Sequence, residues 1–190
     1  GGVVIACNHP FGGADALVAS TLSLRARKDS RIMANAELAA LKPIESLLIP
    51  MEIMGHEGEE RRNVSALRQA LTHLRNGGVL VVFPAGAVAR WQPELGRVAE
   101  QAWSPHISRL IERAGVPVLP VRFFGGNPDW FHLLGAVHPL VRSALIPRVF
   151  LSQRGGKVSC RAGKLLTPEE FPPDPIGLTT LLEQRVREVS

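Results

Sequence analysis

The sequence predicts an α/β domain with a mixed, mostly parallel sheet flanked by helices, and three observations lead to that prediction. Short β-branched runs alternate with longer helical ones, as in domains whose parallel strands are joined by crossover helices. One run, residues 79–84, is apolar throughout, which is typical of a strand covered on both faces. With 45% hydrophobic and 21% charged residues, the 190-residue chain can form one sizeable core. We therefore expect residues 1–190 to form a single domain.

The expected helices follow from apolar spacing and from helix-breaking residues. The clearest covers 59–76, where valine and leucine recur at three- and four-residue spacing until Gly77 and Gly78 end the pattern. The segment 36–48 is also helical, but Pro43 interrupts it because a proline inside a helix clashes with the preceding turn. The other expected helices cover residues 15–27, 105–114 and a closing segment after Pro175.

The expected strands are the short β-branched and apolar runs between these helices. They cover residues 3–7, 31–35, 50–54, 79–84, 116–125, 147–152 and 157–163. The prolines of 116–125 place that strand at a sheet edge or a strand end. A loop containing Trp91 and Pro93 is expected before the helix at 105–114.

Composition and charge limit the partners. The net charge of +5 and the pI near 10.0 favour an anionic partner, which leaves cofactor phosphates, anionic lipid headgroups and nucleic acid open. The chain has no Tyr and only 5% aromatic residues, so recognition of nucleic acid by base stacking is unattractive, and no nucleic-acid partner is expected. Cys7 and Cys160 lack the spacing of a metal site and lie in apolar runs, which indicates buried, reduced thiols.

The sequence contains no stretch that we recognise as a membrane span or a signal peptide. No run approaches the roughly 18 apolar residues that a membrane span requires, and no signal peptide is recognisable. The chain begins without Met and enters a core strand at once. We expect an upstream segment to be missing, and a membrane anchor could have been part of it.

The stretch "CNHPFGGADALVAS", residues 7–20, contains the candidate catalytic pair. His9 follows a predicted strand and Asp15 begins the next helix, a position where ligands gather in α/β sheets. Asp15 would hold the imidazole in one tautomer while the other ring nitrogen takes a proton from an attacking hydroxyl. Gly12 and Gly13 would allow the tight turn, and their amides could face a developing oxyanion. Taken singly, however, Asp is a favoured helix N-cap and Asn-His-Pro a common turn opener.

The rest of the sequence contains no rival nucleophile, Walker-type phosphate loop or zinc-spaced histidine pair, and no metal is predicted. The stretch "NHPFGGAD" resembles the first block of the glycerolipid acyltransferase family, the lysophosphatidic acid acyltransferase-like proteins. Five residues separate His9 from Asp15, and this spacing is similar to that of the hemolysin-like or lyso-ornithine-lipid branch. "IPMEIMGHEGEERRNVSALRQAL", "VLVVFPAGAVAR" and "GVPVLPVRFFGGN" resemble the second, third and fourth blocks in the family's order.

The resemblance implies transfer of a fatty acyl group from acyl-CoA or acyl-carrier protein to the hydroxyl of a lysolipid. His9 would be the general base and Asp15 its orienting residue, with no covalent acyl-enzyme and no further cofactor. Arg61 or Arg62 would hold an acceptor phosphate, since the planar guanidinium grips phosphate oxygens in pairs. The resemblance also implies a peripheral protein on the cytoplasmic face of the membrane. The substrate-binding positions that it implies are Asn8, Gly12, Gly13, Arg61, Arg62, Phe83, Pro84, Gly86, Arg90 and Pro120.

The third block departs from the family's usual Phe-Pro-Glu-Gly-Thr-Arg. Ala85 stands at the usual glutamate, and Ala87 stands where the hemolysin-like branch commonly carries it. Val88 replaces the arginine, with Arg90 as a possible substitute cation. Two alternatives therefore stay open beside acyl transfer: a weakened family member that binds acyl-CoA or lipid, and an acyl thioesterase in which the same base activates water.

Two further groups of side chains have both a structural and a functional interpretation. A basic cluster near the end of the first helix is either a solvated helix end or a site for anionic headgroups or CoA phosphates. It comprises Arg25, Arg27, Lys28 and Arg31. The aromatic side chains could lie in a bilayer interface or in the core. They are Trp91, Trp103, Trp130 and Phe131.

Overall fold

The computed structural model describes residues 1–40, 42–52, 59–128, 131–132, 148, 151–152 and 155–190. The strands are β1 (Val3–Cys7), β2 (Ser30–Asn35), β3 (Leu48–Met51), β4 (Val79–Val82), β5 (Arg90–Gln92), β6 (Arg97–Ala99), β7 (Val118–Phe124) and β8 (Ser159–Ala162). The α-helices are α1 (Gly13–Ala26), α2 (Glu59–Arg75), α3 (Pro105–Ala114) and α6 (Pro175–Glu188). Short 3-10 helices are η1 (Ala36–Ala40), η2 (Lys42–Leu47), η3 (Pro93–Leu95) and η4 (Pro168–Glu170).

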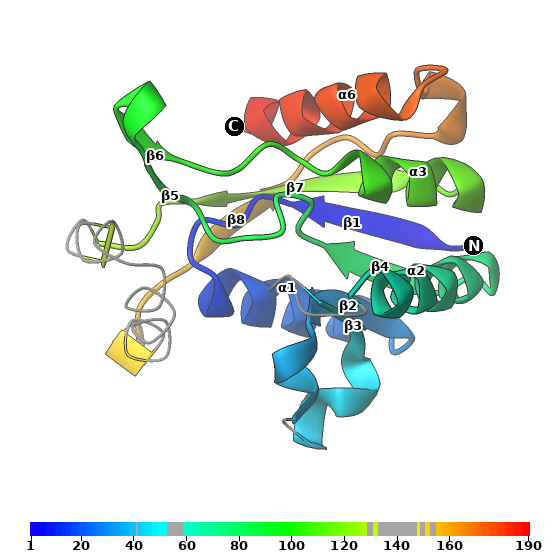
Figure 1. The fold of residues 1–190 in the computed structure, drawn as a ribbon, viewed down its shortest axis with the longest axis horizontal. Helices are drawn as coiled ribbons and strands as arrows, with labels where there is room; N and C mark the ends of the chain where they lie inside the picture. The colour runs from blue at the N-terminus through cyan, green and yellow to red at the C-terminus, as the bar shows by residue number, and fades with distance from the viewer. Residues whose placement is uncertain (41, 53–58, 129–130, 133–147, 149–150, 153–154) are drawn as a thin grey trace.

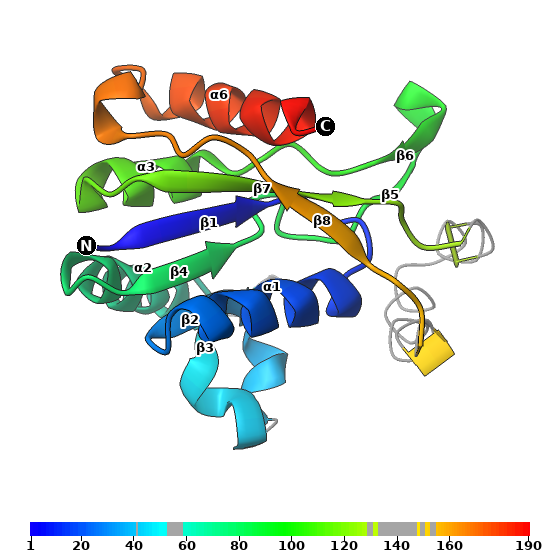
Figure 2. The same ribbon diagram turned by 180° about the vertical axis from the view of Figure 1, so that it is seen from behind.

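A six-stranded sheet forms the centre of the domain, in the order β3-β2-β4-β1-β7-β8. Neighbouring strands from β3 to β7 are parallel, and β8 pairs antiparallel with β7. The prediction of a single α/β domain with a mixed, mostly parallel sheet is confirmed. The strands β5 and β6 form a separate antiparallel hairpin, which projects beyond the sheet in Figures 1 and 2.

Helices cover both faces of the sheet, and the strand residues alternate between two hydrophobic cores. Helices α2, α3 and α6 lie on one face, and α1 lies on the other (Figures 1 and 2). In β1, Val4 and Ala6 join the core under α2, α3 and α6, whereas Cys7 joins the core under α1. This period of two, repeated in β4, explains why residues 79–82 are apolar throughout.

The prolines of the strand with Pro117 and Pro120 predicted either a sheet edge or a strand end. Pro117 does lie at the strand end, directly before the first residue of β7, but the edge is corrected by the structure. That strand, β7, lies between β1 and β8 inside the sheet. Pro120 is tolerated because β8 ends at Ala162, and the chain next bridges to β7 only where Leu166 pairs with Val118. Beside this gap in the pairing of β7 with β8, the Pro120 carbonyl accepts a hydrogen bond from the Gly163 N–H. Proline has no N–H to donate, but no acceptor of β8 lies opposite it, so no hydrogen-bond partner is left unsatisfied.

Three other predictions change in detail. The helix expected over 36–48 is two 3-10 helices, η1 and η2, on either side of residue 41. The strand expected at 147–152 is wrong at its described residues 148 and 151–152, which are helical, and its remaining residues lie outside the described part of the chain. The loop with Trp91 and Pro93 is the hairpin of β5 and β6, whose strands of three residues are too short for an alternating pattern.

The closing helix α6 contributes to the larger core, and Leu182 tests that contribution. Its side chain is 1% exposed among residues of α2, α3 and the sheet. We expect Leu182→Ala to lower the free energy of unfolding by about 2–5 kcal/mol, because the lost methyl groups leave a cavity in a packed core. Urea denaturation measures this change. Leu165→Ala, at a 41% exposed leucine, is the matched control, and an equal loss in both variants would contradict this assignment of the core.

Candidate active site

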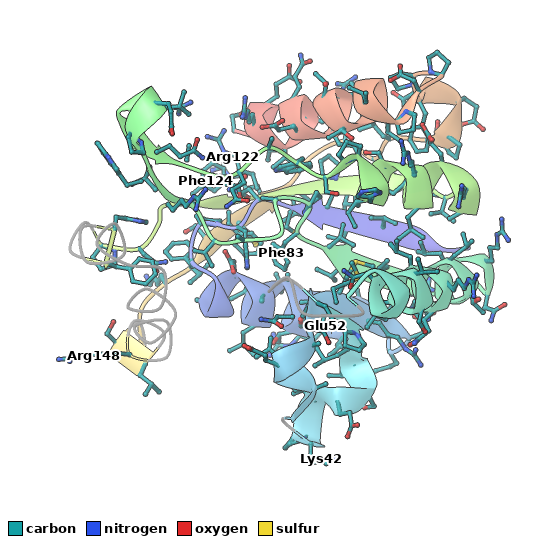
Figure 3. The ribbon with its side chains drawn as sticks, viewed as in Figure 1. Lys42, Glu52, Phe83, Arg122, Phe124 and Arg148 are labelled. Carbon is teal, nitrogen blue, oxygen red and sulfur yellow. The ribbon has the colours of Figure 1, made fainter. Side chains whose placement is uncertain are left out.

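The candidate site lies at the edge where the parallel strands end. Three adjacent strands, β4, β1 and β7, run in the same direction and bring their carboxyl ends together. His9 follows β1 by two residues, Phe83 follows β4 directly, and Asn127 follows β7 by three. Figure 3 shows Phe83 at this end of the sheet, on the side where α1 begins. Ligands of α/β sheets bind at this edge.

Asp15 is fixed at the start of α1 by the backbone around it. The helix begins at Gly13, two residues earlier than predicted, so Asp15 occupies its third position. One carboxylate oxygen, Oδ2, accepts from the Phe11 N–H at 2.9 Å and the Gly12 N–H at 3.2 Å, and Oδ1 accepts from the Ala16 N–H at 2.8 Å. The side chain is fully buried, so these three donors replace water around its charge. The carboxylate therefore closes the helix start from its third position, whereas the structural interpretation expected Asp15 as the N-cap, a position that Gly12 occupies.

The same carboxylate also contacts His9, so the two interpretations coexist. Nδ1 of His9 lies 3.1 Å from Oδ1 of Asp15, close enough for a charge contact although not aligned as a hydrogen bond. Such alignment often improves only when substrate is bound. The imidazole is 16% exposed and packs on the Phe83 ring, with centroids 4.2 Å apart. Within the described part of the chain, Nε2 of His9 has no hydrogen-bond partner.

Gly12 is required by the turn between the two side chains. Its φ of 86° lies in the left-handed region, and a Cβ there would come within 2.8 Å of Val88 Cγ2. Its amide already donates to Asp15, so it is engaged before any substrate arrives. The amide of Gly13, the first residue of α1, donates to no described residue.

Two asparagines attach the His9 loop to β7 and the segment after it. Asn8 uses its carboxamide twice on Phe123, accepting from the backbone N–H at 2.6 Å and donating to the carbonyl at 2.9 Å. Asn127 donates to the carbonyl of Phe11 at 3.2 Å. Beyond the end of β1, where the backbone hydrogen bonds between β1 and β7 stop, these side-chain bonds hold the loop to β7 and to the segment after it. Substrate binding by Asn8 stays a prediction, and the observed role of its side chain is to hold the loop.

The third block forms the turn beside His9. The Gly86 N–H donates to the Phe83 carbonyl, and the positive φ of Gly86, 69°, reverses the chain. The carbonyl of the buried Pro84 accepts from the Ser104 N–H, which closes the segment at its base. The Ala89 N–H then donates to the His9 carbonyl at 3.0 Å. The third block thus supports the backbone of His9 even without the usual glutamate.

The remaining predicted site residues lie farther from His9 or outside the described side chains. Arg90 is exposed on β5, and Pro120 is buried within β7 at the level of Ala6. Arg61 and Arg62 lie in the first turn of α2, which follows β3 and therefore starts at the same edge of the sheet. Their side chains lie outside the described part of the structure.

One carboxylate beside His9 was missed by sequence reasoning. Oε1 of Glu100 accepts a hydrogen bond from the backbone N–H of His9, and Oε2 lies 3.4 Å from Nε1 of Trp103. Burial raises the pKa of Glu100 above its ordinary value of 4.5, and the bonds from His9 and Trp103 partly oppose that rise. Because 91 residues separate Glu100 from His9, no local spacing could have revealed the contact.

The basic cluster lies away from this site. Arg27 pairs with Asp29 at 2.6 Å and donates to the carbonyls of Gly1 and Gly77. Gly1 precedes β1 and Gly77 precedes β4, so this arginine holds the opposite edge of the sheet from His9. Arg27 therefore has a structural role at the end of α1, and binding of anionic headgroups or CoA phosphates by the cluster stays a prediction.

The aromatic residues divide between core and surface. Trp103 and Phe131 are buried, and Trp91 is 45% exposed on the hairpin. Trp130 lies outside the described residues. Within the described part of the chain, no helix is long and apolar enough to cross a bilayer, and no three metal-ligand side chains are grouped together.

Comparison with known proteins identifies the family. A family model described as Acyltransferase matches residues 1–123, which include His9, Asp15 and the parallel strands of the sheet except the last residue of β7, Phe124. No curated protein matches the chain. The match covers well over half of the 190 residues and agrees with the four blocks of the sequence. The chain therefore belongs to the glycerolipid acyltransferase family and is an O-acyltransferase of that type.

Proposed function

We propose that this enzyme esterifies the hydroxyl of a lysolipid with a fatty acyl group from a thioester, with His9 as general base and Asp15 as its orienting residue. The observation that supports the proposal best is the buried Asp15 carboxylate 3.1 Å from Nδ1 of a partly exposed imidazole. That contact favours the tautomer with its proton on Nδ1, which leaves Nε2 as the basic atom.

The reaction is a direct transfer. Nε2 of His9 takes the proton of the acceptor hydroxyl as the oxygen attacks the thioester carbonyl carbon. The tetrahedral intermediate then collapses, the carbon–sulfur bond breaks, and the leaving thiolate takes the proton back from the imidazolium. An ester and a free thiol result, and His9 returns to its starting state. Asp15 stabilises the imidazolium between the two proton transfers.

The start of α1 is placed to stabilise the oxyanion that develops on the thioester carbonyl. The Gly13 N–H has no described acceptor, and the positive end of a fourteen-residue helix lies beside His9. Amides placed where negative charge develops stabilise the transition state more than the ground state. The Gly12 N–H, in contrast, is already occupied by Asp15.

The substrate assignments extend this proposal. The donor is acyl-CoA or acyl-carrier protein, and the acceptor is a lysophospholipid or a lyso-ornithine-type lipid presented at a membrane surface. The net charge of +5 supports an anionic substrate or surface. Arg61 and Arg62 are the proposed phosphate ligands, because α2 starts at the same sheet edge as the catalytic pair. The sequence motif "NHPFGG" favours the hemolysin-like branch of the family.

Measuring thiol release from palmitoyl-CoA, with and without a panel of lysolipids, tests the proposal. We expect release that depends on one class of acceptor and produces the corresponding diacyl lipid. Equal release without any acceptor would replace the proposal by a thioesterase. Bound palmitoyl-CoA without release would instead support a lipid-binding member, in agreement with the missing third-block glutamate at Ala85 and Ala87. Repeating the assay with palmitoyl-carrier protein covers the second donor.

A further inference from the structure

The second half of the third block and the residues after it fold back onto the loop of His9. We call residues 84–104 the hairpin segment. It is closed at its base by the Ser104 N–H bond to the Pro84 carbonyl, and it projects beyond the sheet (Figures 1 and 2). Val88 covers Gly12, so a side chain of this segment also packs against the catalytic turn.

The backbone of His9 is held by this segment on both sides. The His9 carbonyl accepts from the Ala89 N–H before the hairpin, and the His9 N–H donates to the Glu100 carboxylate after it. The first bond joins two backbone groups, so almost any residue could form it. The second requires the side chain at position 100. Glu100 is therefore the side chain that links the returning arm of the hairpin segment to His9.

The position of Glu100 is itself fixed. Gln92, on the opposite strand, donates to the carbonyls of Ala99 at 3.2 Å and Glu100 at 2.6 Å. The buried Trp103 approaches the second carboxylate oxygen with its indole N–H. A mostly buried carboxylate costs free energy, and an apolar or amide side chain would fill the space without a charge. Retaining a charge in this place, beside a catalytic histidine, points to a role in the reaction.

We infer that Glu100 is a positioning residue of the active site, which fixes the backbone of His9 and supplies a second negative charge beside its imidazole. The inference rests on the proposed role of His9 as general base. A fixed His9 backbone keeps the ring over Phe83 and beside Asp15, and small displacements of a catalytic group are costly. The negative charge favours the imidazolium that forms when His9 takes the acceptor proton.

The effect of the Glu100 charge on His9 can be tested without measuring turnover, by NMR of the His9 ring. The charged and titratable described groups around it are Asp15 on α1, Glu100 in the hairpin segment, and Cys7 at the end of β1. Burial raises the pKa of the Cys7 thiol, with the charges of Asp15, Cys160 and Glu100 adding to that rise, so the thiol stays neutral at physiological pH. Removing Glu100's charge should therefore leave Asp15 as the one carboxylate beside the imidazole.

Glu100→Gln removes the charge and keeps an acceptor for the His9 N–H. In protein labelled at histidine, we expect the NMR signals of the His9 ring at pH 7 to move relative to the native chain, because a charge beside the ring is lost. The His9 signals are assigned by their loss in His9→Ala. Glu94→Gln, at the exposed tip of the same hairpin, is the matched control and should leave these signals unchanged. Unchanged ring signals in Glu100→Gln would overturn the electrostatic part of the inference.

Glu100→Asp gives the complementary test, because it keeps the charge but shortens the side chain so that it no longer reaches the His9 N–H. With the acceptor identified above, we expect both variants to lower kcat by about 10–100-fold with KM changed less than about threefold. Native kcat in both would overturn the inference, even if one of them moves the ring signals of His9. If His9→Ala itself keeps native activity, the proposed function fails instead, and the ring signals still report whether Glu100 faces His9.

The pH dependence of stability provides a second readout that needs no substrate. Because burial raises the pKa of Glu100, the folded state binds its proton more tightly than the unfolded state. Stability present below the ordinary value of 4.5 is therefore lost as the pH rises through the raised pKa. Glu100→Gln lacks this loss, so the melting temperature of the variant minus that of the native chain should increase from about pH 4 to pH 7. A difference that stays constant over this range would contradict a buried charge at Glu100.

Discussion

Replacing His9 by alanine is expected to lower acceptor-dependent thiol release by about 10²–10⁴-fold, the usual contribution of a general base. The change removes the imidazole with both of its ring nitrogens and leaves the backbone bonds of residue 9 to Ala89 and Glu100 in place. The side chain is partly exposed, so its removal creates no closed cavity in either core. We expect the circular dichroism spectrum to match that of the native chain and the melting temperature to change by only a few degrees. Thiol release at saturating acyl donor and lysolipid measures the loss.

His106→Ala is the matched control for this variant. His106 is exposed near the start of α3, and its backbone rather than its ring bonds to Ser104. It should retain native turnover and stability. If His9→Ala turns over as fast as His106→Ala, His9 is not the base. If both variants lose activity together, the loss comes from a general effect of substitution on the protein and not from the chemistry of His9. The assignment of His9 as the base would then lose its support.

The architecture was predictable because its signals are local in the sequence. Alternation of β-branched and helical runs depends on neighbouring residues, and it correctly gave β1, β2, β4, β7, α2 and α3. The strand expected at 50–54 lies instead at Leu48–Met51, as β3. The helix α3 was placed at its observed bounds, Pro105–Ala114, because Pro105 begins it and Gly115 ends it with a φ of 62°. The contact between the two residues proposed as the catalytic pair was also local, since one tight turn connects His9 and Asp15.

The parts that escaped prediction depend on contacts between distant residues. Pro120 is a proline in an interior strand, and it is acceptable there only because β8 has ended beside it. Asn8 was assigned to substrate by resemblance, and its bonds with Phe123, 115 residues away, cannot be read from the motif. Glu100 has the same property at a separation of 91 residues. When the partner of a side chain lies in another helix or strand, no regular spacing between residues in the sequence reveals the contact.

Asp15→Asn is expected to have an effect at least as large as that of His9→Ala, for two separable reasons. The first is chemical. A carboxylate favours the proton on Nδ1 of His9, whereas a carboxamide can donate to that nitrogen and favour the other tautomer, which blocks Nε2 as a base. An aspartate-to-asparagine change of this kind costs about 10⁴-fold in kcat in the serine protease triad, and a similar loss is expected here. Thiol release with native and variant protein at equal concentration measures it.

The second reason is structural, and it distinguishes Asp15 from a residue that serves the reaction alone. Both carboxylate oxygens accept backbone N–H bonds, from Phe11 and Gly12 on one side and from Ala16 on the other. A carboxamide has one oxygen, so its NH₂ group must face a buried donor, and leaving such a donor unsatisfied costs about 1–3 kcal/mol. We therefore expect Asp15→Asn to unfold at lower urea concentration than the native chain, unlike His9→Ala. Asp29→Asn, at an exposed aspartate paired with Arg27, is the matched control and should leave both the urea midpoint and the activity close to those of the native chain, because exposed ion pairs contribute little to stability. If Asp15→Asn loses stability yet retains turnover, the carboxylate only closes the helix start, and another group must orient His9.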